Sequence, residues 1–267
     1  MVPRVPQMTR MCIAAAIAAT TAFAGSSALA ADLAVKAPTS PATWTGVYLG
    51  LNAGGAWADA RSNLELIQNN GSAAAANTIL TAAGSSGFSP ASFSGGGQLG
   101  FNYQFAPRIV GGAEVDWSYL GLNAARQTLP VARLPDPAVD FREDLGIRSL
   151  ATLRARLGWL ATPRLLLFLS GGVAVADIVY SQRIHFVQVP DTSFNQGTVS
   201  GWRAGPVAGA GTEYALAPHW TARAEYLYAT FKSAGFVSTN SFDPTYVLRH
   251  GIDAKVSIGR VAINYRF

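Results

Sequence analysis

Hydrophobic residues alternate with polar or small residues along most of the chain after residue 43, most clearly in the last segment, 255–267. Successive side chains of a β-strand point to opposite faces, so alternate residues share a face. In this segment Arg266, Asn264 and Arg260 share one face. The other face carries Phe267, Tyr265, Ile263 and Val261. The pattern predicts a closing strand with one polar face and one apolar face that contacts lipid.

Seven upstream segments repeat this alternation, so the sequence predicts eight strands. The predicted strands are residues 44–57, 92–105, 109–119, 147–161, 165–180, 200–215, 220–231 and 255–267. Pro206 falls inside the sixth strand. Because proline has no N–H to donate, it requires a bulge or a position where no ladder hydrogen bond is made.

The connections between these strands alternate in length. Three are tight turns with a central proline, at 106–108, 162–164 and 217–219. The others are long and are predicted to be loops, at 58–91, 120–146, 181–199 and 232–251, with a short helix over 72–83 in the first. Outer-membrane barrels keep periplasmic turns short and external loops long. The alternation of short turns and long loops therefore predicts an all-β fold, an eight-stranded antiparallel up-and-down transmembrane β-barrel.

Composition supports a membrane barrel over a helical membrane protein. The chain is 49% hydrophobic and only 13% charged, with mean hydropathy +0.21. After the first thirty residues no apolar run is long enough for a spanning helix. The net charge is +5, but the basic residues are scattered, so we expect no nucleic-acid partner.

The first thirty residues have the features of a secretory signal peptide. Arg4 and Arg10 flank the start of an apolar, alanine-rich stretch. Ala28 and Ala30 form an A-x-A cleavage site, so the mature chain is predicted to begin at Ala31. We expect a signal peptide over 1–30, a periplasmic lead-in over 31–43 and an outer-membrane barrel over 44–267. The protein is then exported to the outer membrane of a Gram-negative cell.

The polar strand faces carry acids and arginines that point into one lumen if the barrel closes. The candidate lumen charge network is Glu114, Asp116, Arg154, Arg156, Arg203, Glu213, Arg223, Glu225 and Arg260, with Arg148 and Arg266 on the same predicted faces. An eight-stranded barrel is just wide enough for its side chains to fill, and buried charges must pair. We expect an ion-pair plug that holds the strands in register. A selectivity lining for a narrow pore and an acid–base pair for catalysis are the alternatives.

Other chemistry finds little support in the sequence. His185, His219 and His250 are predicted to lie in loops and a turn, without metal-ligand spacing, and the one cysteine, Cys12, leaves with the signal peptide. The glycine run 95–97 is not followed by a helix, as a phosphate-binding loop requires. We therefore expect no cofactor, metal or catalytic site. The tryptophans are predicted to form interfacial belts near strand ends. They are Trp44, Trp57, Trp117, Trp159, Trp202 and Trp220.

Several motifs resemble the small alphaproteobacterial outer-membrane proteins of the porin family, the OmpA-like β-barrel type. They are ALAADL at 28–33, WTGVYLGLNAG at 44–54, RAEYLY at 223–228 and NYRF at 264–267. The resemblance implies an abundant eight-stranded barrel that supports envelope integrity and exposes surface loops. It also implies that the terminal aromatic residue acts as a signal to the barrel-assembly machinery.

These observations predict a non-enzymatic outer-membrane protein with a structural role in the bacterial envelope. Passage of small solutes through the lumen, and adhesion or host interaction through the loops, are the alternative functions. The expected partners are outer-membrane lipid, the barrel-assembly machinery during insertion and an extracellular partner at the loops.

Overall fold

The computed structural model describes residues 43–68, 74–128, 131–133, 136–187 and 193–267. The predicted signal peptide, its cleavage site and nearly all of the lead-in lie outside the described residues. The eight long strands are β1 (Gly46–Gln68), β3 (Ala91–Ala106), β4 (Ile109–Gln127), β6 (Asp136–Thr162), β7 (Leu165–Phe186), β8 (Phe194–Ala215), β9 (Trp220–Thr239) and β10 (Val247–Arg266). The short elements are α1 (Ala74–Ala83), β2 (Gly87–Phe88) and β5 (Val131–Arg133).

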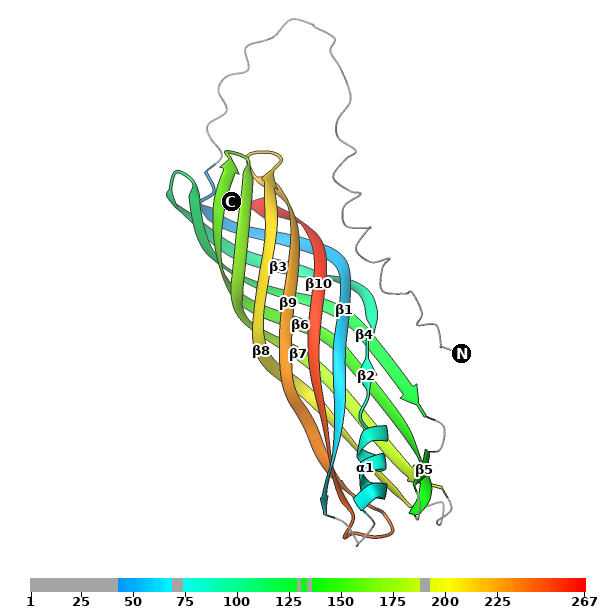
Figure 1. The fold of residues 1–267 in the computed structure, drawn as a ribbon. Helices are drawn as coiled ribbons and strands as arrows, with labels where there is room; N and C mark the ends of the chain where they lie inside the picture. The colour runs from blue at the N-terminus through cyan, green and yellow to red at the C-terminus, as the bar shows by residue number, and fades with distance from the viewer. Residues whose placement is uncertain (1–42, 69–73, 129–130, 134–135, 188–192) are drawn as a thin grey trace, which may run out of the picture. The chain divides into compact units, whose positions relative to one another are not determined.

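Each long strand pairs antiparallel with the next, and the last pairs with the first (Figure 1). The closing ladder between β1 and β10 begins at Tyr48↔Arg266 and continues to Gln68↔Val247. Closure leaves no strand edge unpaired in lipid, which a spanning sheet requires. The predicted eight-stranded antiparallel barrel is therefore confirmed, as are the three proline turns and the helix in the first connection.

Most strands are longer than predicted, because each continues into a segment that the sequence analysis assigned to a loop. On β1 the outward residues change from Leu51 and Trp57 to Asp59 and Arg61, while the inward residues become small and apolar, as at Ala58. The side chains still alternate, but the apolar face is now the inner one. A search for apolar residues facing lipid therefore ends each strand too early.

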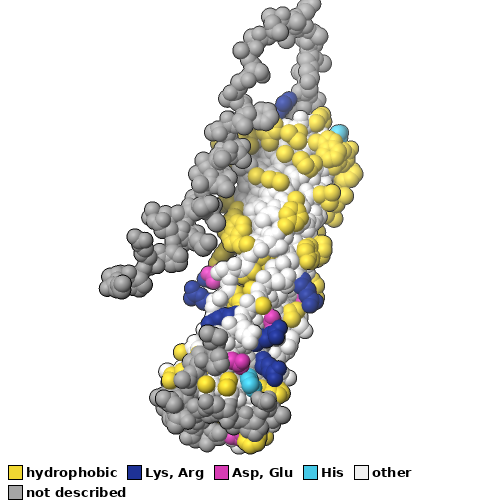
Figure 2. Space-filling model, turned by 90° about the vertical axis from the view of Figure 1, so that its right-hand side faces the viewer, with side chains coloured by type: hydrophobic (Ala, Val, Ile, Leu, Met, Phe, Trp, Pro, Cys, Tyr) yellow, Lys and Arg dark blue, Asp and Glu magenta, His cyan; other side chains and the backbone are white. Residues whose placement is uncertain are grey.

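The outer face carries a hydrophobic band near the end that bears the C-terminus and charges nearer the other end (Figure 2). At the closing ladder the apolar band ends at Trp57↔Ser257, and the next outward pair is the oppositely charged Asp59↔Lys255. We take this step as the outer edge of the membrane-spanning part. Strand residues beyond it project from the membrane on the side of the long connections.

Five of the six tryptophans lie exposed on the outer face, between 44% and 57% accessible, as an interfacial belt requires. They are Trp57, Trp117, Trp159, Trp202 and Trp220. Trp44 corrects the prediction, because it is fully buried inside the periplasmic end of the barrel. Its Nε1 donates to the Pro163 carbonyl at 3.2 Å, and the Arg266 guanidinium lies 5.0 Å from its ring centre.

The C-terminal residues face the way the sequence predicts. Phe267, Val261 and Ile263 are exposed on the outer face, and Tyr265 is partly exposed between its aromatic neighbours. Its ring lies edge-on to those of Phe267 and Trp220, at 5.1 and 5.2 Å. No helix within the described ranges has the length and hydropathy to cross a membrane.

Candidate functional site: the barrel lumen

The lumen at membrane level is filled by a buried network of charges centred on Arg154. Its guanidinium donates to Glu225 Oε1 at 2.5 Å, to Glu114 Oε1 at 2.5 Å and to Asp116 Oδ2 at 2.9 Å. These four side chains come from β6, β9 and β4, so the contacts join strands that are not all neighbours in the wall. Arg154 is 1% exposed, so its charge is neutralised by these carboxylates and not by solvent.

Arg260 binds two of the same carboxylates from the β10 side. It donates to Asp116 Oδ1 and to Glu225 Oε2, at 2.9 and 2.8 Å. Each of these carboxylates is therefore shared between Arg154 and Arg260. Shared carboxylates satisfy both oxygens, which offsets part of the cost of burying them.

Arg156 and Arg223 form the other half of the network with Glu213. Arg156 donates to Glu213 Oε2 at 2.9 Å, and Arg223 pairs with the same oxygen at 3.0 Å. Arg223 also donates to Glu114 Oε2 at 2.5 Å, which connects the two halves. The Tyr48 hydroxyl donates to Glu114 and accepts a hydrogen bond from Arg156.

The network contains four arginines and four carboxylates, so its formal charge is zero. All eight side chains are buried and were predicted to lie in the lumen. They are Glu114, Asp116, Arg154, Arg156, Glu213, Arg223, Glu225 and Arg260. Each of these eight side chains therefore has at least one oppositely charged partner.

Three other predicted arginines lie outside this network. Arg203 points inward from β8 but has no carboxylate partner among the described residues, and its Nε is buried without a hydrogen bond. Arg148 is exposed on the outer wall, because the ladder between β6 and β7 shifts register between Ile147 and Leu150. Arg266 donates to backbone carbonyls at the periplasmic end, including that of Pro218. The bulge that turns Arg148 outward has no proline or glycine to mark it in the sequence.

An apolar layer fills the lumen on the extracellular side of the charges. Its members are inward residues of nearly all strands, and the sequence analysis did not predict them. The larger ones are Phe88, Leu120, Leu122, Leu145, Ile147, Leu150, Ile178, Leu227, Phe231, Ile252, Val256 and Ile258. The sequence of β10 does indicate this layer, because Ile258, Val256 and Ile252 continue the inward face that carries Arg260.

A second polar cluster lies beyond the apolar layer, outside the membrane-spanning part, around Glu143 and His250. Glu143 accepts hydrogen bonds from the Tyr180 hydroxyl at 2.9 Å and from the Gln182 amide at 2.8 Å. The Gln182 side chain also contacts His250 Nδ1 at 2.5 Å. Burial and the negative charge of Glu143 raise the pKa of Tyr180 well above its usual value. The cluster cross-links β6, β7 and β10 inside the barrel.

His250 corrects the prediction that it lies in a loop, because it is fully buried in β10. Its Nε2 lies 2.7 Å from Ser238 Oγ, and the Phe236 ring stacks on it with centres 4.4 Å apart. Burial lowers the pKa of His250 to about 4. This serine–histidine pair is a poor catalytic dyad, because both residues are buried and so weakly basic an imidazole is a weak general base. His185 also lies in a strand, β7, and only His219 is in a turn.

Helix α1 packs into the extracellular end of the barrel. Leu80 is fully buried against an apolar cluster that includes Phe141, Ile184 and Tyr246. The segment after the helix is held by polar contacts: the Gly84 carbonyl accepts from Gln182 at 2.9 Å. These contacts define a lid, residues 74–86.

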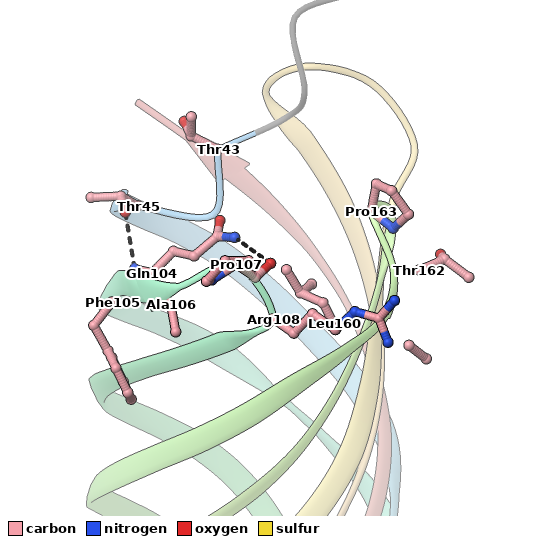
Figure 3. Close-up of a pocket in the computed structure, with 11 residues that line it drawn as sticks. Thr43, Thr45, Gln104, Phe105, Ala106, Pro107, Arg108, Leu160, Thr162 and Pro163 are labelled. Carbon is pink, nitrogen blue, oxygen red and sulfur yellow. Dashed lines mark hydrogen bonds between the residues drawn. The ribbon is translucent and has the colours of Figure 1, made fainter.

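The periplasmic rim has a hollow of about 600 Å³ beside the first two proline turns (Figure 3). Gln104 crosses it: its backbone N–H donates to Thr45 Oγ1 at 3.0 Å, and its side-chain Nε2 donates to the Pro107 carbonyl at 3.1 Å. Beneath it the cluster of Trp44, Leu160 and Leu166 fills the barrel end. The hollow is therefore a depression on a closed end.

Among the residues that the structure describes, no three His, Cys, Asp or Glu side chains are grouped as metal ligands would be. The wall and lumen contacts thus use the titratable side chains for cross-strand pairing. The arrangement can hold register and resist hydration.

The chain is similar to known outer-membrane proteins. The chain is 29% identical over 262 residues to the 31 kDa outer-membrane immunogenic protein of Brucella melitensis, covering 94% of this chain and 98% of that protein. Two solved structures are more distant. OprG of Pseudomonas aeruginosa is 14% identical with a TM-score of 0.44, covering 85% of this chain and 99% of that one. Ail of Yersinia pestis is 11% identical with a TM-score of 0.29, covering 78% and 97%.

The family assignment rests on a match that covers almost the whole sequence. The family model of the outer membrane protein beta-barrel domain matches residues 15–267. The closed ladder and the outward hydrophobic band are the physical features that such a domain needs. The chain belongs to the outer-membrane β-barrel protein family.

Proposed function

We propose that this protein is a structural component of the outer membrane whose lumen is sealed, and that it acts without catalysis. The observation that supports this proposal most directly is the neutral, buried network of four arginines and four carboxylates centred on Arg154. Its members join strands across the barrel, so the network resists shear of one strand past another. A rigid, sealed barrel at high abundance strengthens the membrane without making it leaky.

The layers above and below the network support a sealed lumen. An ion crossing the barrel would have to displace Trp44 at the periplasmic end, separate the buried ion pairs and then cross the apolar layer. Breaking a buried ion pair costs about 3–5 kcal/mol, and an unpaired ion in the apolar layer costs more. These barriers act in series, which favours the structural role over solute passage.

Reconstitution into planar bilayers tests this function. The purified barrel, shown to be folded by its altered gel mobility before boiling, is expected to give no unitary current steps in concentrated KCl. Reproducible steps of one size, scaling in number with added protein, would establish a channel instead and would refute the sealed lumen.

A barrel in the outer membrane must first be exported and inserted. We infer that residues 1–30 are removed as a signal peptide and that the terminal aromatic strand is read by the barrel-assembly machinery. The A-x-A motif at Ala28 and Ala30 supports the first, and the outward Phe267 supports the second. N-terminal sequencing of protein from outer membranes is expected to begin at Ala31. A mature chain that retains Arg10 would contradict cleavage.

Extracellular recognition is a second candidate function, favoured by the long strands that extend past the membrane edge. The Brucella relative is named for being immunogenic, which supports exposure of the corresponding surface here. Cells carrying the protein are compared with cells carrying a version in which 236–246, at the β9–β10 tip, is replaced by a short turn. Unchanged adhesion to host cells would argue against a role for that tip.

A further inference from the structure

The lipid-facing wall of the barrel carries an apolar groove of about 650 Å³. The groove crosses neighbouring strands, from β9 over β10, β1, β3 and β4 to β6 (Figure 1). One of its sides follows consecutive ladder pairs, Ala151↔Trp117, Trp117↔Gly97, Gly97↔Leu51 and Leu51↔Ile263. The side chains of Leu51, Trp117 and Ile263 are exposed on the outer face. The groove therefore opens to lipid and not to the lumen.

Gly97 forms part of the floor of this groove. It lies in the ladders between Leu51 and Trp117, whose large side chains flank it. A Cβ at Gly97 would meet no atom nearer than 3.6 Å, so strand packing does not require a glycine there. By contrast, a Cβ at Gly96 would strike the Trp117 carbonyl oxygen. Packing therefore accounts for Gly96, whereas Gly97 leaves a hollow on the outer face that packing does not need.

The groove begins at the periplasmic rim of the membrane-spanning part. Trp220, the first residue of β9, and Tyr265, near the end of β10, line this end with ring centres 5.2 Å apart. Tryptophan and tyrosine favour the level of the lipid head groups. On β1 the groove is lined by Leu49 and Leu51, which lie nearer to the start of the strand than to Trp57 at the outer edge. The groove therefore lies mainly in the periplasmic leaflet.

The groove climbs from this rim into the membrane as it crosses the sheet. Strands of such barrels tilt by about 40°, so a line drawn across them is inclined to the membrane plane. Accordingly, Trp220 begins β9, whereas Ala151 lies well inside β6. From β10 to β6 the groove crosses four strand gaps of about 4.8 Å, so it is about 19 Å long. One leaflet of hydrocarbon is about 15 Å deep, so the groove has the length and the slope of an acyl chain that starts at the rim.

We propose that this groove binds one acyl chain of a phospholipid from the periplasmic leaflet, with the head group at the level of Trp220 and Tyr265. Within a bilayer, lipid chains are as apolar as leucine, so binding depends on van der Waals contact. A chain in the hollow contacts the protein below and on both flanks, whereas a chain on the flat wall contacts it only below. A second barrel fits the groove less well. Two convex walls would meet at the exposed Leu51 and Trp117 and leave the hollow between them unfilled.

Native mass spectrometry of the full barrel, purified from outer membranes in detergent and stripped of lipid, tests the proposal. The probe is dipalmitoyl phosphatidylethanolamine, and we expect the wild type to bind one molecule saturably. In Gly97→Leu the new side chain fills the hollow, and the apparent affinity is expected to be about tenfold weaker. The matched control is Gly171→Leu on the lipid-facing side of β7, where a Cβ would meet no atom nearer than 3.9 Å. This control is expected to bind as the wild type does.

Each other outcome bears directly on the proposal. Equal affinity of Gly97→Leu and wild type, with both barrels folded by gel mobility, overturns it, as does a wild type that binds no phospholipid saturably. A wild-type dimer that Gly97→Leu converts to a monomer would show that a second copy occupies the groove. The wild type alone also tests the role of the chain, independently of how any variant folds. Dihexanoyl phosphatidylethanolamine has the same head group and short chains, and equally tight binding of this lipid would overturn a site for the acyl chain.

Discussion

At the scale of single residues, the charge balance of the lumen makes each arginine of the network hard to replace. Arg154 contacts three carboxylates, so Arg154→Met leaves them with one cation fewer in a buried site. We expect the variant to lose about 3–5 kcal/mol of unfolding free energy, measured by urea titration and gel mobility in detergent.

The control for this prediction is Arg148→Met, whose side chain is exposed on the wall and whose loss is expected to change stability by less than about 0.5 kcal/mol. Adding Glu225→Gln to Arg154→Met restores neutrality, so the double variant is expected to be more stable than the single one. A double variant whose loss equals the sum of both single losses would show that charge balance is not what holds the network.

His250 makes stability depend on pH outside the membrane. Its pKa is lowered to about 4 in the folded barrel, whereas an unfolded histidine titrates near its ordinary value of about 6.5. Between these pH values the folded state binds fewer protons than the unfolded state. The stability that neutral His250 contributes is therefore complete above about pH 6.5 and is lost as the pH falls toward about 4. The loss amounts to about 3 kcal/mol.

Comparison with His250→Gln isolates this contribution, because carboxylates titrate equally in both proteins. The stability of the wild type relative to the variant is expected to fall as the pH is lowered from 7 to 4, by urea titration at each pH. A difference that stays constant over this range would mean that His250 titrates normally in the fold.

At the scale of elements, sequence alternation predicts the membrane-spanning part of each strand and the short turns. It underestimates strand length, because beyond Trp57 the apolar residues face inward and the charged Asp59 and Arg61 face out. It places eight lumen charges on the correct face, since their strands stay in phase. It misplaces Arg148, because a one-residue bulge reverses the face and leaves no mark in the sequence.

Pairing partners are harder to predict than faces. Arg203 shares the inward face of β8 with Glu213, but it lies too far along the strand to reach the carboxylates of the network. That distance depends on the stagger between strands, which a single sequence does not give. Trp44 was misplaced although the alternation indicates its direction, because it shares the inward face of β1 with Tyr48 and Asn52. Its position near a strand end, which is typical of an interfacial belt, led to the wrong prediction.

The lid depends on a single large side chain of α1. Leu80 is fully buried, whereas Ile79 beside it is exposed. Leu80→Asp places a charge in an apolar cluster and is expected to release the helix. Protease added to intact cells should then cleave the protein within its first long connection. Ile79→Asp is the matched control and is expected to remain resistant. Equal resistance of both variants would mean that Leu80 does not hold the lid.

The closing strand ends on Phe267, whose N–H donates to the Val47 carbonyl at 3.0 Å. Removing this residue deletes one hydrogen bond and one lipid-facing ring, which is expected to lower the stability of the barrel by about 2 kcal/mol. Because we infer that it is also read during assembly, we expect outer-membrane levels to fall severalfold, by immunoblot of membrane fractions. Phe242→Ala, an exposed aromatic at the other end, is the control. Levels equal to wild type would refute the assembly role.

At the scale of the whole molecule, the interior is layered along the barrel, and the layers alternate in chemistry. From the periplasmic end these are the Trp44 cluster, the charge network, the apolar layer, the polar cluster at Glu143 and the apolar cluster under α1. Any path for an ion crosses all of them in turn. The resistance of such a path is set by the least permeable layer and not by the lid.

Opening the lid alone is therefore expected to leave the barrel closed. In planar bilayers Leu80→Asp should give no unitary currents, even where protease shows that the lid has been released, because the network around Arg154 and the ring of Trp44 remain in place. Arg154→Met, with the lid intact, should also stay closed. Unitary steps from Leu80→Asp but not from wild type would show instead that the lid is the gate, and that the ion pairs beneath it let ions pass.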